Sequence, residues 1–143
     1  MDALAGAAWI LGLLVAATLL GFWLRARSAR VQTERGNERL DASDFDLDQF
    51  GPAGAVVQFS TEFCSRCPST KRQLAALTSA HATLQFQHLD VTGRPELASK
   101  YRLLQTPTVF TIGADGILRS RLSGALTRTQ LTTAVNELTG ETP

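Results

Sequence analysis

Both cysteines of the chain lie in one short segment, Phe63-Cys64-Ser65-Arg66-Cys67-Pro68, which constrains the fold more than any other stretch. An apolar run at residues 55–59 precedes the segment, and residues 71–77 follow it with helical spacing of their apolar positions. A strand that turns into a helix here puts the first cysteine at the helix N-terminus, where free N–H groups and the macrodipole stabilise a thiolate. The second cysteine is about one turn further on, close enough to form a disulfide with the first. The pattern predicts a redox-active pair.

Two other interpretations of the cysteine pair stay open. As a metal site, the pair would supply two of the four ligands of a tetrahedral zinc ion, but the sequence has no second cysteine pair to complete the site. The two histidines are His81, near the end of the expected helix, and His88, in the next strand pattern, both positions with ordinary structural uses. A purely structural disulfide is the other alternative, although closing so short a loop restricts the unfolded chain little.

The composition limits the protein to one domain with an appendage. The chain has 143 residues and a formal net charge of +1, and no basic patch is interleaved with aromatic residues. We therefore expect no nucleic-acid partner. Two cysteines are too few for a scaffold held together by disulfides.

The appendage is an uncharged stretch at residues 3–24, long enough as a helix to cross about 30 Å of hydrocarbon. A cleaved signal peptide would carry basic residues before its apolar core, and here Asp2 follows Met1. We interpret residues 1–24 as a single-pass transmembrane anchor and residues 25–50 as a juxtamembrane linker with an acidic lead-in. Arginines follow the apolar stretch at positions 25, 27, 30 and 35. The positive-inside rule then favours a cytoplasmic domain, with an extracytoplasmic domain as the alternative.

The acidic lead-in contains Asp44-x-Asp46-x-Asp48, the spacing that begins a calcium-binding loop. Such a loop needs Gly at its sixth position and Glu at its twelfth, where this chain has Gln49 and Ala55. We reject calcium binding. We expect a short strand or turn whose apolar residues pack on the domain while the aspartates face water; the apolar residues are Leu40, Phe45, Leu47 and Phe50.

The remaining chain, residues 51–143, alternates strand and helix patterns. We expect strands at 55–60, 84–91, 108–112 and 117–122, a helix from Cys64, a short helix at 95–101 and a closing helix through residues 126–138. The order β-α-β-α-β-β-α predicts an α/β domain with a mixed four-stranded central sheet and helices on both faces.

Two further segments complete a resemblance to a known family. Thr106-Pro107-Thr108 precedes an apolar strand, and Gly124 follows the last strand. Together with the Cys-x-x-Cys helix they resemble the thioredoxin superfamily, over about residues 55–138. The chain is similar to its membrane-anchored thiol-disulfide interchange proteins. The resemblance implies a cis Thr106–Pro107 bond beside the cysteine pair.

The resemblance also implies roles for individual residues. Cys64 is the attacking thiolate and Cys67 the resolving thiol, with no cofactor beyond the pair. The expected partners are protein disulfide or dithiol substrates and a redox partner, and the protein is expected to be a monomer. Substrate contacts fall on Phe63, Thr106, Pro107 and Gly124, and tuning of the thiol pKa falls on Ser65 and Arg66.

The chain departs from thioredoxins proper at several positions. Those proteins carry Trp-Cys-Gly-Pro-Cys, whereas this chain has Phe63 and Ser65-Arg66. Their buried aspartate falls on Gln58, and its lysine partner on Phe86. The sequence predicts a membrane-anchored thiol–disulfide oxidoreductase. The alternative function is a membrane-tethered copper or zinc chaperone that uses the cysteine pair and His88.

Overall fold

The chain divides into two compact units, residues 1–30 and 31–143. Within them, the computed structural model describes residues 2–28 and 38–140. The first unit contains one helix, α1 (Asp2–Ser28), which includes the uncharged stretch of the sequence. Across the described residues, no helix combines the length and the apolar character that crossing a membrane demands. The prediction of a helix is therefore confirmed, whereas the prediction of a transmembrane anchor is not. The basic linker lies largely outside the described residues.

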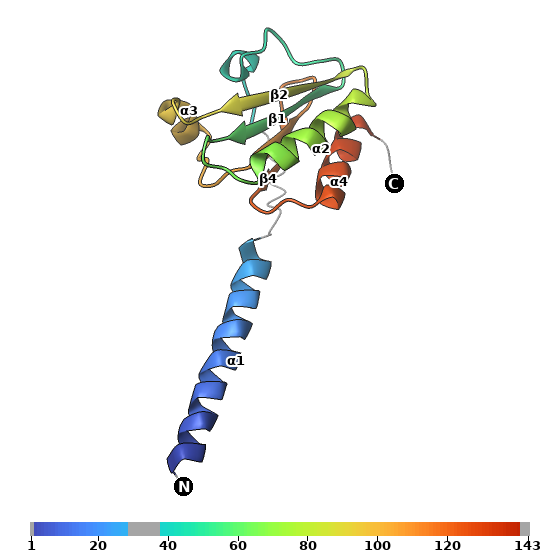
Figure 1. Cartoon of the computed structure of the whole chain (residues 1–143). Helices are drawn as coiled ribbons and strands as arrows, with labels where there is room; N and C mark the ends of the chain where they lie inside the picture. Colours follow the sequence, from blue (N-terminus) through green and yellow to red (C-terminus); the bar gives the residue numbers. More distant parts are fainter. Residues whose placement is uncertain (1, 29–37, 141–143) are drawn as a thin grey trace. The chain divides into compact units, whose positions relative to one another are not determined.

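The second unit is built on a four-stranded mixed sheet with the order β2-β1-β3-β4 (Figure 1). The strands are β1 (Gly54–Ser60), β2 (Leu84–Asp90), β3 (Thr108–Ile112) and β4 (Leu118–Ser123). β1 pairs parallel to β2 and antiparallel to β3, and β3 pairs antiparallel to β4. The predicted mixed sheet is confirmed.

β1 lies between β2 and β3 in the interior of the sheet. Every one of its residues is buried, as its nearly continuous apolar sequence predicts. Gly54 opens the strand with φ = 109°, a conformation that L side chains rarely adopt. A Cβ at this position would come within 2.1 Å of the carbonyl oxygen of Ile112. The glycine therefore lets β1 enter the sheet beside β3.

Helices cover both faces of the sheet. α2 (Cys67–Ser79) and α4 (Arg128–Thr139) cover one face, where Val56, Leu74 and Leu131 belong to one core cluster. The other face packs against the 3-10 helix η1 (Ala42–Phe45) and α3 (Pro95–Lys100). Aromatic rings contact one another in this second cluster; they are Phe45, Phe50, Phe59, Tyr101 and Phe110.

The acidic lead-in packs on the domain as predicted, but two of its aspartates form hydrogen bonds and ion pairs with the domain. Asp44 accepts hydrogen bonds from the Tyr101 hydroxyl and the Lys100 ammonium group, and Asp46 pairs with Arg94. Burial, followed by the hydrogen bond to Asp44, raises the pKa of Tyr101 above its usual range. These contacts attach the lead-in to α3 and the residues beside it.

Candidate active site

Cys64 and Cys67 form a disulfide at the junction of β1 and α2, with an S–S distance of 2.04 Å and a Cα–Cα distance of 5.5 Å. α2 begins at Cys67, so the expectation of a helix from Cys64 is wrong. Cys64 lies in the turn before the helix, and the N–H of Cys67 donates to its carbonyl oxygen at 3.3 Å. Pro68 occupies the first turn of α2, where a residue without an N–H costs no helical hydrogen bond.

The N-terminus of α2 acts directly on the outer sulfur. The N–H of Cys67 also donates to Sγ of Cys64, at 3.2 Å. Cys64 is half-buried, whereas Cys67 is only 3% exposed. An incoming sulfur therefore reaches Cys64 first, and a negative charge on its sulfur meets a backbone donor.

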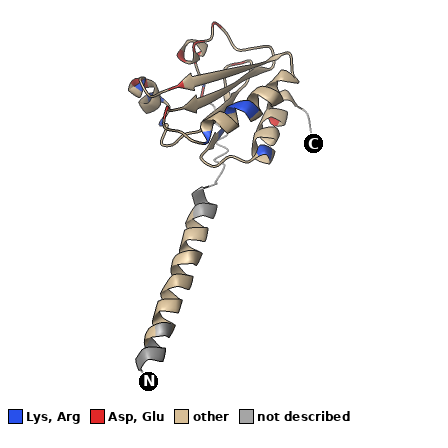
Figure 2. Cartoon of the chain, in the orientation of Figure 1, with Lys and Arg blue, Asp and Glu red and all other residues tan. Residues whose placement is uncertain are grey.

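Apart from the exposed Glu62 in the preceding turn, the charges near this helix start are positive. Arg66 stands at the N-cap of α2, is exposed, and makes no side-chain capping hydrogen bond. No acidic residue lies in the first turn, and Lys71 and Arg72 follow within the helix, which Figure 2 shows as a basic band on α2. Ser65 is exposed beside Arg66. The local field favours a thiolate at Cys64.

The structure brings the proline loop to the cysteine loop. The Thr106–Pro107 bond is cis, as predicted. The hydroxyl groups of Thr61 and Thr106 are hydrogen-bonded at 3.2 Å, which joins the loop before Cys64 to the loop before β3. Gly124, with φ = 92°, donates its N–H to the carbonyl oxygen of Pro107 at 2.9 Å. The predicted substrate-contact residues Thr106, Pro107 and Gly124 therefore lie together, although their roles remain predictions.

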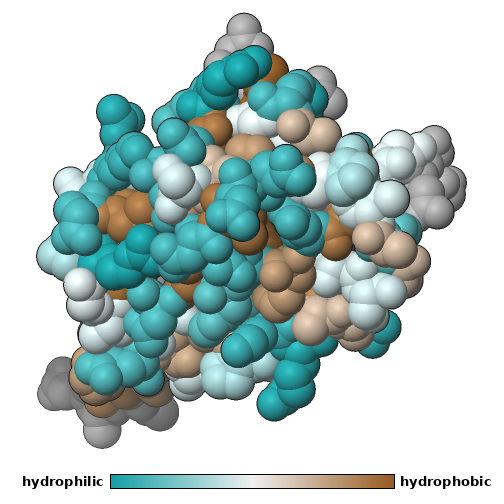
Figure 3. Space-filling model, turned by 90° about the horizontal axis from the view of Figure 1, so that it is seen from above, coloured by the Kyte–Doolittle hydropathy of each residue, from teal (hydrophilic) through white to brown (hydrophobic). Residues whose placement is uncertain are grey.

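Two large apolar side chains are exposed on the described part of the domain, residues 38–140. Phe63 is 87% exposed and Leu104 is 93% exposed. The face visible in Figure 3 is mostly hydrophilic, with small separate apolar areas. Sequence reasoning identified Phe63 and missed Leu104. The neighbouring Leu103 packs on the core, and no sequence pattern distinguishes the two adjacent leucines.

Gln58 of β1 is a fully buried polar residue that contacts the pair: its Nε2 donates to the carbonyl oxygen of Cys67 at 3.0 Å. In the parallel register, Gln58 lies beside His88, and Phe86 lies beside Val56. The sequence resemblance to thioredoxins places Phe86 at the position of the lysine that partners the buried aspartate. That prediction is wrong, because His88 is the residue beside Gln58. The register depends on the crossover through α2, and counting residues along the sequence does not give it.

His88 belongs to a small polar group on the same face of the sheet. Its Nε2 is hydrogen-bonded to the Ser60 hydroxyl at 2.8 Å. Burial, and secondly the positive charge of Lys71, lowers the pKa of His88. Within residues 2–28 and 38–140, no three His, Cys, Asp or Glu side chains are placed to hold a metal ion together.

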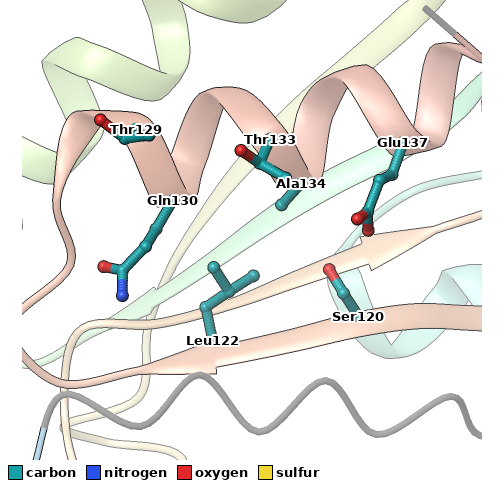
Figure 4. A pocket seen from close by; sticks show the side chains of 7 residues that line it. All are labelled: Ser120, Leu122, Thr129, Gln130, Thr133, Ala134 and Glu137. Carbon is teal, nitrogen blue, oxygen red and sulfur yellow. The ribbon is translucent and has the colours of Figure 1, made fainter. Parts of the chain in front are cut away.

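A pocket of about 160 Å³ lies elsewhere, between β4 and α4 (Figure 4). Its walls carry hydroxyl, amide and carboxylate groups around an apolar floor; the lining residues are Ser120, Leu122, Thr129, Gln130, Thr133, Ala134 and Glu137. None of them belongs to the cysteine or proline loop. The pocket is therefore separate from the disulfide.

Comparisons with known proteins agree with this geometry. The thioredoxin family model matches residues 42–137. The chain is similar to the oxidised form of mitochondrial thioredoxin 3 of Saccharomyces cerevisiae, at 26% identity and a TM-score of 0.52 over 58% of this chain and 76% of that one. It also shares its fold with thioredoxin 1 of Thermosipho africanus, at 13% identity and a TM-score of 0.53 over 58% and 91% of the two chains. No curated protein gives a significant match.

Proposed function

Because the chain belongs to the thioredoxin family, we propose that it is a membrane-attached thiol–disulfide oxidoreductase that acts on protein substrates. Thiol–disulfide exchange is the activity that its domain and cysteine pair support. One observation carries the proposal: the half-buried Sγ of Cys64 accepts a helix N-terminal N–H, while Cys67 lies buried behind it. This asymmetry distinguishes an attacking sulfur from a resolving one.

The reaction follows from the asymmetry when the pair starts as a dithiol. The Cys64 thiolate attacks one sulfur of a substrate disulfide, and the other substrate sulfur leaves as a thiolate. Cys67 then loses its proton and attacks Sγ of Cys64. The second substrate sulfur leaves, and the 64–67 disulfide forms. The substrate gains two electrons and two protons, and the protein loses them.

Substrate contact is assigned to the surface around Cys64. Phe63 and Leu104 offer exposed apolar side chains on the two loops that the Thr61–Thr106 hydrogen bond joins. An extended peptide with apolar residues near its disulfide fits this chemistry. No second copy of the chain is required by this arrangement, and we propose a monomer.

Reduction of insulin by the full chain in detergent, with dithiothreitol as the electron source, tests the activity. Turnover should be lost in Cys64→Ser and retained in Ser99→Ala, which changes an exposed residue of α3 without removing a sulfur. The metal-chaperone alternative predicts the opposite pattern: no turnover, and tight stoichiometric copper binding that depends on both cysteines.

For the location, we propose that the N-terminal helix attaches the domain to the cytoplasmic side of a membrane. The support is the absence of charge in residues 3–24 and the arginines that follow. In a reducing cytosol the pair would be mostly dithiol, and the protein would act as a reductase. Alkaline phosphatase fused after Pro143 in a bacterial host tests the side: low activity is expected, and high activity would place the domain outside.

A further inference from the structure

Gln58 carries a buried oxygen whose partner the disulfide form does not supply. The side chain is fully buried, and Nε2 donates to the carbonyl oxygen of Cys67 at 3.0 Å. A carbonyl oxygen only accepts, so the amide nitrogen must face it, and this contact fixes the orientation of the amide. The other amide atom, Oε1, has no hydrogen-bond partner among the described residues. A buried acceptor without a donor is costly, so native proteins rarely keep one.

Reduction of the disulfide creates a buried thiol donor on Cys67, whose carbonyl oxygen already accepts from the Gln58 amide. In the disulfide, Sγ of Cys67 carries no hydrogen; in the dithiol it carries an S–H, and Cys67 is only 3% exposed. An S–H group is a weak donor that needs a nearby acceptor when water is excluded. Among the described residues, the disulfide form thus has an unused acceptor on Gln58, and the dithiol form gains a donor on Cys67, the residue whose backbone carbonyl the same amide contacts.

We propose that Oε1 of Gln58 accepts a hydrogen bond from the Cys67 thiol in the dithiol state. The inference rests on the proposed function only in assuming that the pair cycles between disulfide and dithiol. An external dithiol supplies two electrons and two protons and is itself oxidised to a disulfide. One of the protons stays on Sγ of Cys67 and occupies the Gln58 oxygen. The amide is satisfied at both ends only in the dithiol, so Gln58 shifts the equilibrium toward the reduced pair.

The hydrogen bond is read directly from the S–H stretching band in infrared spectra. In full-length Cys64→Ala, the thiol of Cys67 is the single thiol of the chain, so its band is unambiguous. We expect the band at the lower frequency of a hydrogen-bonded S–H. Gln58→Leu should move it to the frequency of a free thiol. A free-thiol frequency with Gln58 present would overturn the proposal, and this reading needs no Gln58 variant to fold.

The energetic consequence is measured by equilibrating the full chain, with both cysteines, against glutathione. Gln58→Leu should lower the equilibrium constant for reduction of the pair by about two- to threefold, because an S–H group is a weak donor and its hydrogen bond lies at the low end of the usual range. Gln58→Met, which keeps a long flexible side chain, should give the same direction if Leu is poorly accommodated.

Gln85→Leu is the matched control. Gln85 also has a buried Oε1 for which residues 2–28 and 38–140 supply no partner, but its register partner in β1 is Ala55, near the strand end opposite the cysteines. It should change neither the S–H band nor the glutathione equilibrium. An unchanged equilibrium in both Gln58 variants would overturn the proposal. If the unmodified full chain does not reduce insulin but the S–H band of Cys67 still moves on Gln58→Leu as expected, the proposed function is contradicted and the Gln58 inference stands.

Discussion

The acidity of Cys64 is decided by groups within a few residues of it. In the disulfide, the N–H of Cys67 already points at Sγ of Cys64, and the same donor will serve the thiolate after reduction. We predict that the thiol of reduced Cys64 has a pKa well below about 8.5, the value of a free cysteine. Thiolate absorbance followed against pH, in Cys67→Ser, measures it. A titration at the free value would contradict the role assigned to the helix N-terminus.

Arg66 provides the variant that checks this prediction. Arg66→Glu places a negative charge between the cysteines and should raise the pKa of the Cys64 thiol, because a like charge opposes ionisation. Arg72→Glu is the matched control. It reverses the same charge at an exposed site further along α2, so its effect should be smaller.

A second residue-scale prediction concerns His88, whose pKa is lowered by burial and by Lys71. The folded protein therefore holds its imidazole neutral more strongly than the unfolded chain, whose histidine titrates near about 6.5. As the pH falls from about 7.5 through about 6.5, the unfolded chain takes up this proton first, and the free energy of unfolding should decrease. Urea unfolding at several pH values should show a weaker decrease in His88→Gln. The same decrease in both proteins would assign the effect to other groups.

At the scale of elements, α4 is the helix whose start is best defined. The Thr127 hydroxyl accepts from the N–H of Gln130, and the Gln130 side chain accepts from the N–H of Thr127. Thr127→Ala removes one side of this capping box, and we predict that the free energy of unfolding falls by about 1 kcal/mol. Chemical denaturation measures it. Thr133→Ala, at an exposed site within α4, is the control and should be neutral or slightly stabilising.

The strands could be predicted from the sequence to within about a residue at most ends, because burial dictates their apolar pattern. The start of α2 could not, because no side-chain cap marks it: Arg66 at the N-cap makes no capping hydrogen bond. The neighbour of Gln58 also escaped prediction, since a parallel register is set by a long crossover. The exposure of Leu104 depends on the path of a loop and has no local periodicity to reveal it.

At the scale of the whole molecule, the two core clusters found among the described residues belong to one unit of the chain. Both core clusters draw on residues 40–138, and none of their members comes from α1. We predict that a fragment starting at Gly36 folds, runs as a monomer and reduces insulin as fast as the full chain in detergent. Circular dichroism, size-exclusion chromatography and the insulin assay check the three parts. An unfolded or inactive fragment would show that the first 35 residues contribute to the domain.

The hydrogen bond between Gly124 and Pro107 bears on how a substrate would be held under the proposed function. Pro107 has no N–H, and its carbonyl oxygen is used by Gly124. Within the described chain, the backbone of Thr106 is left for an incoming peptide, because this residue is otherwise bonded through its hydroxyl. Thr106 offers one backbone N–H and one backbone C=O, and each hydrogen bond contributes about 1 kcal/mol. Under the proposed function, we therefore expect these backbone contacts to hold a substrate only weakly. We expect its residence time to be set by the mixed disulfide together with apolar contacts to Phe63 and Leu104, and the product to leave once its last sulfur is free.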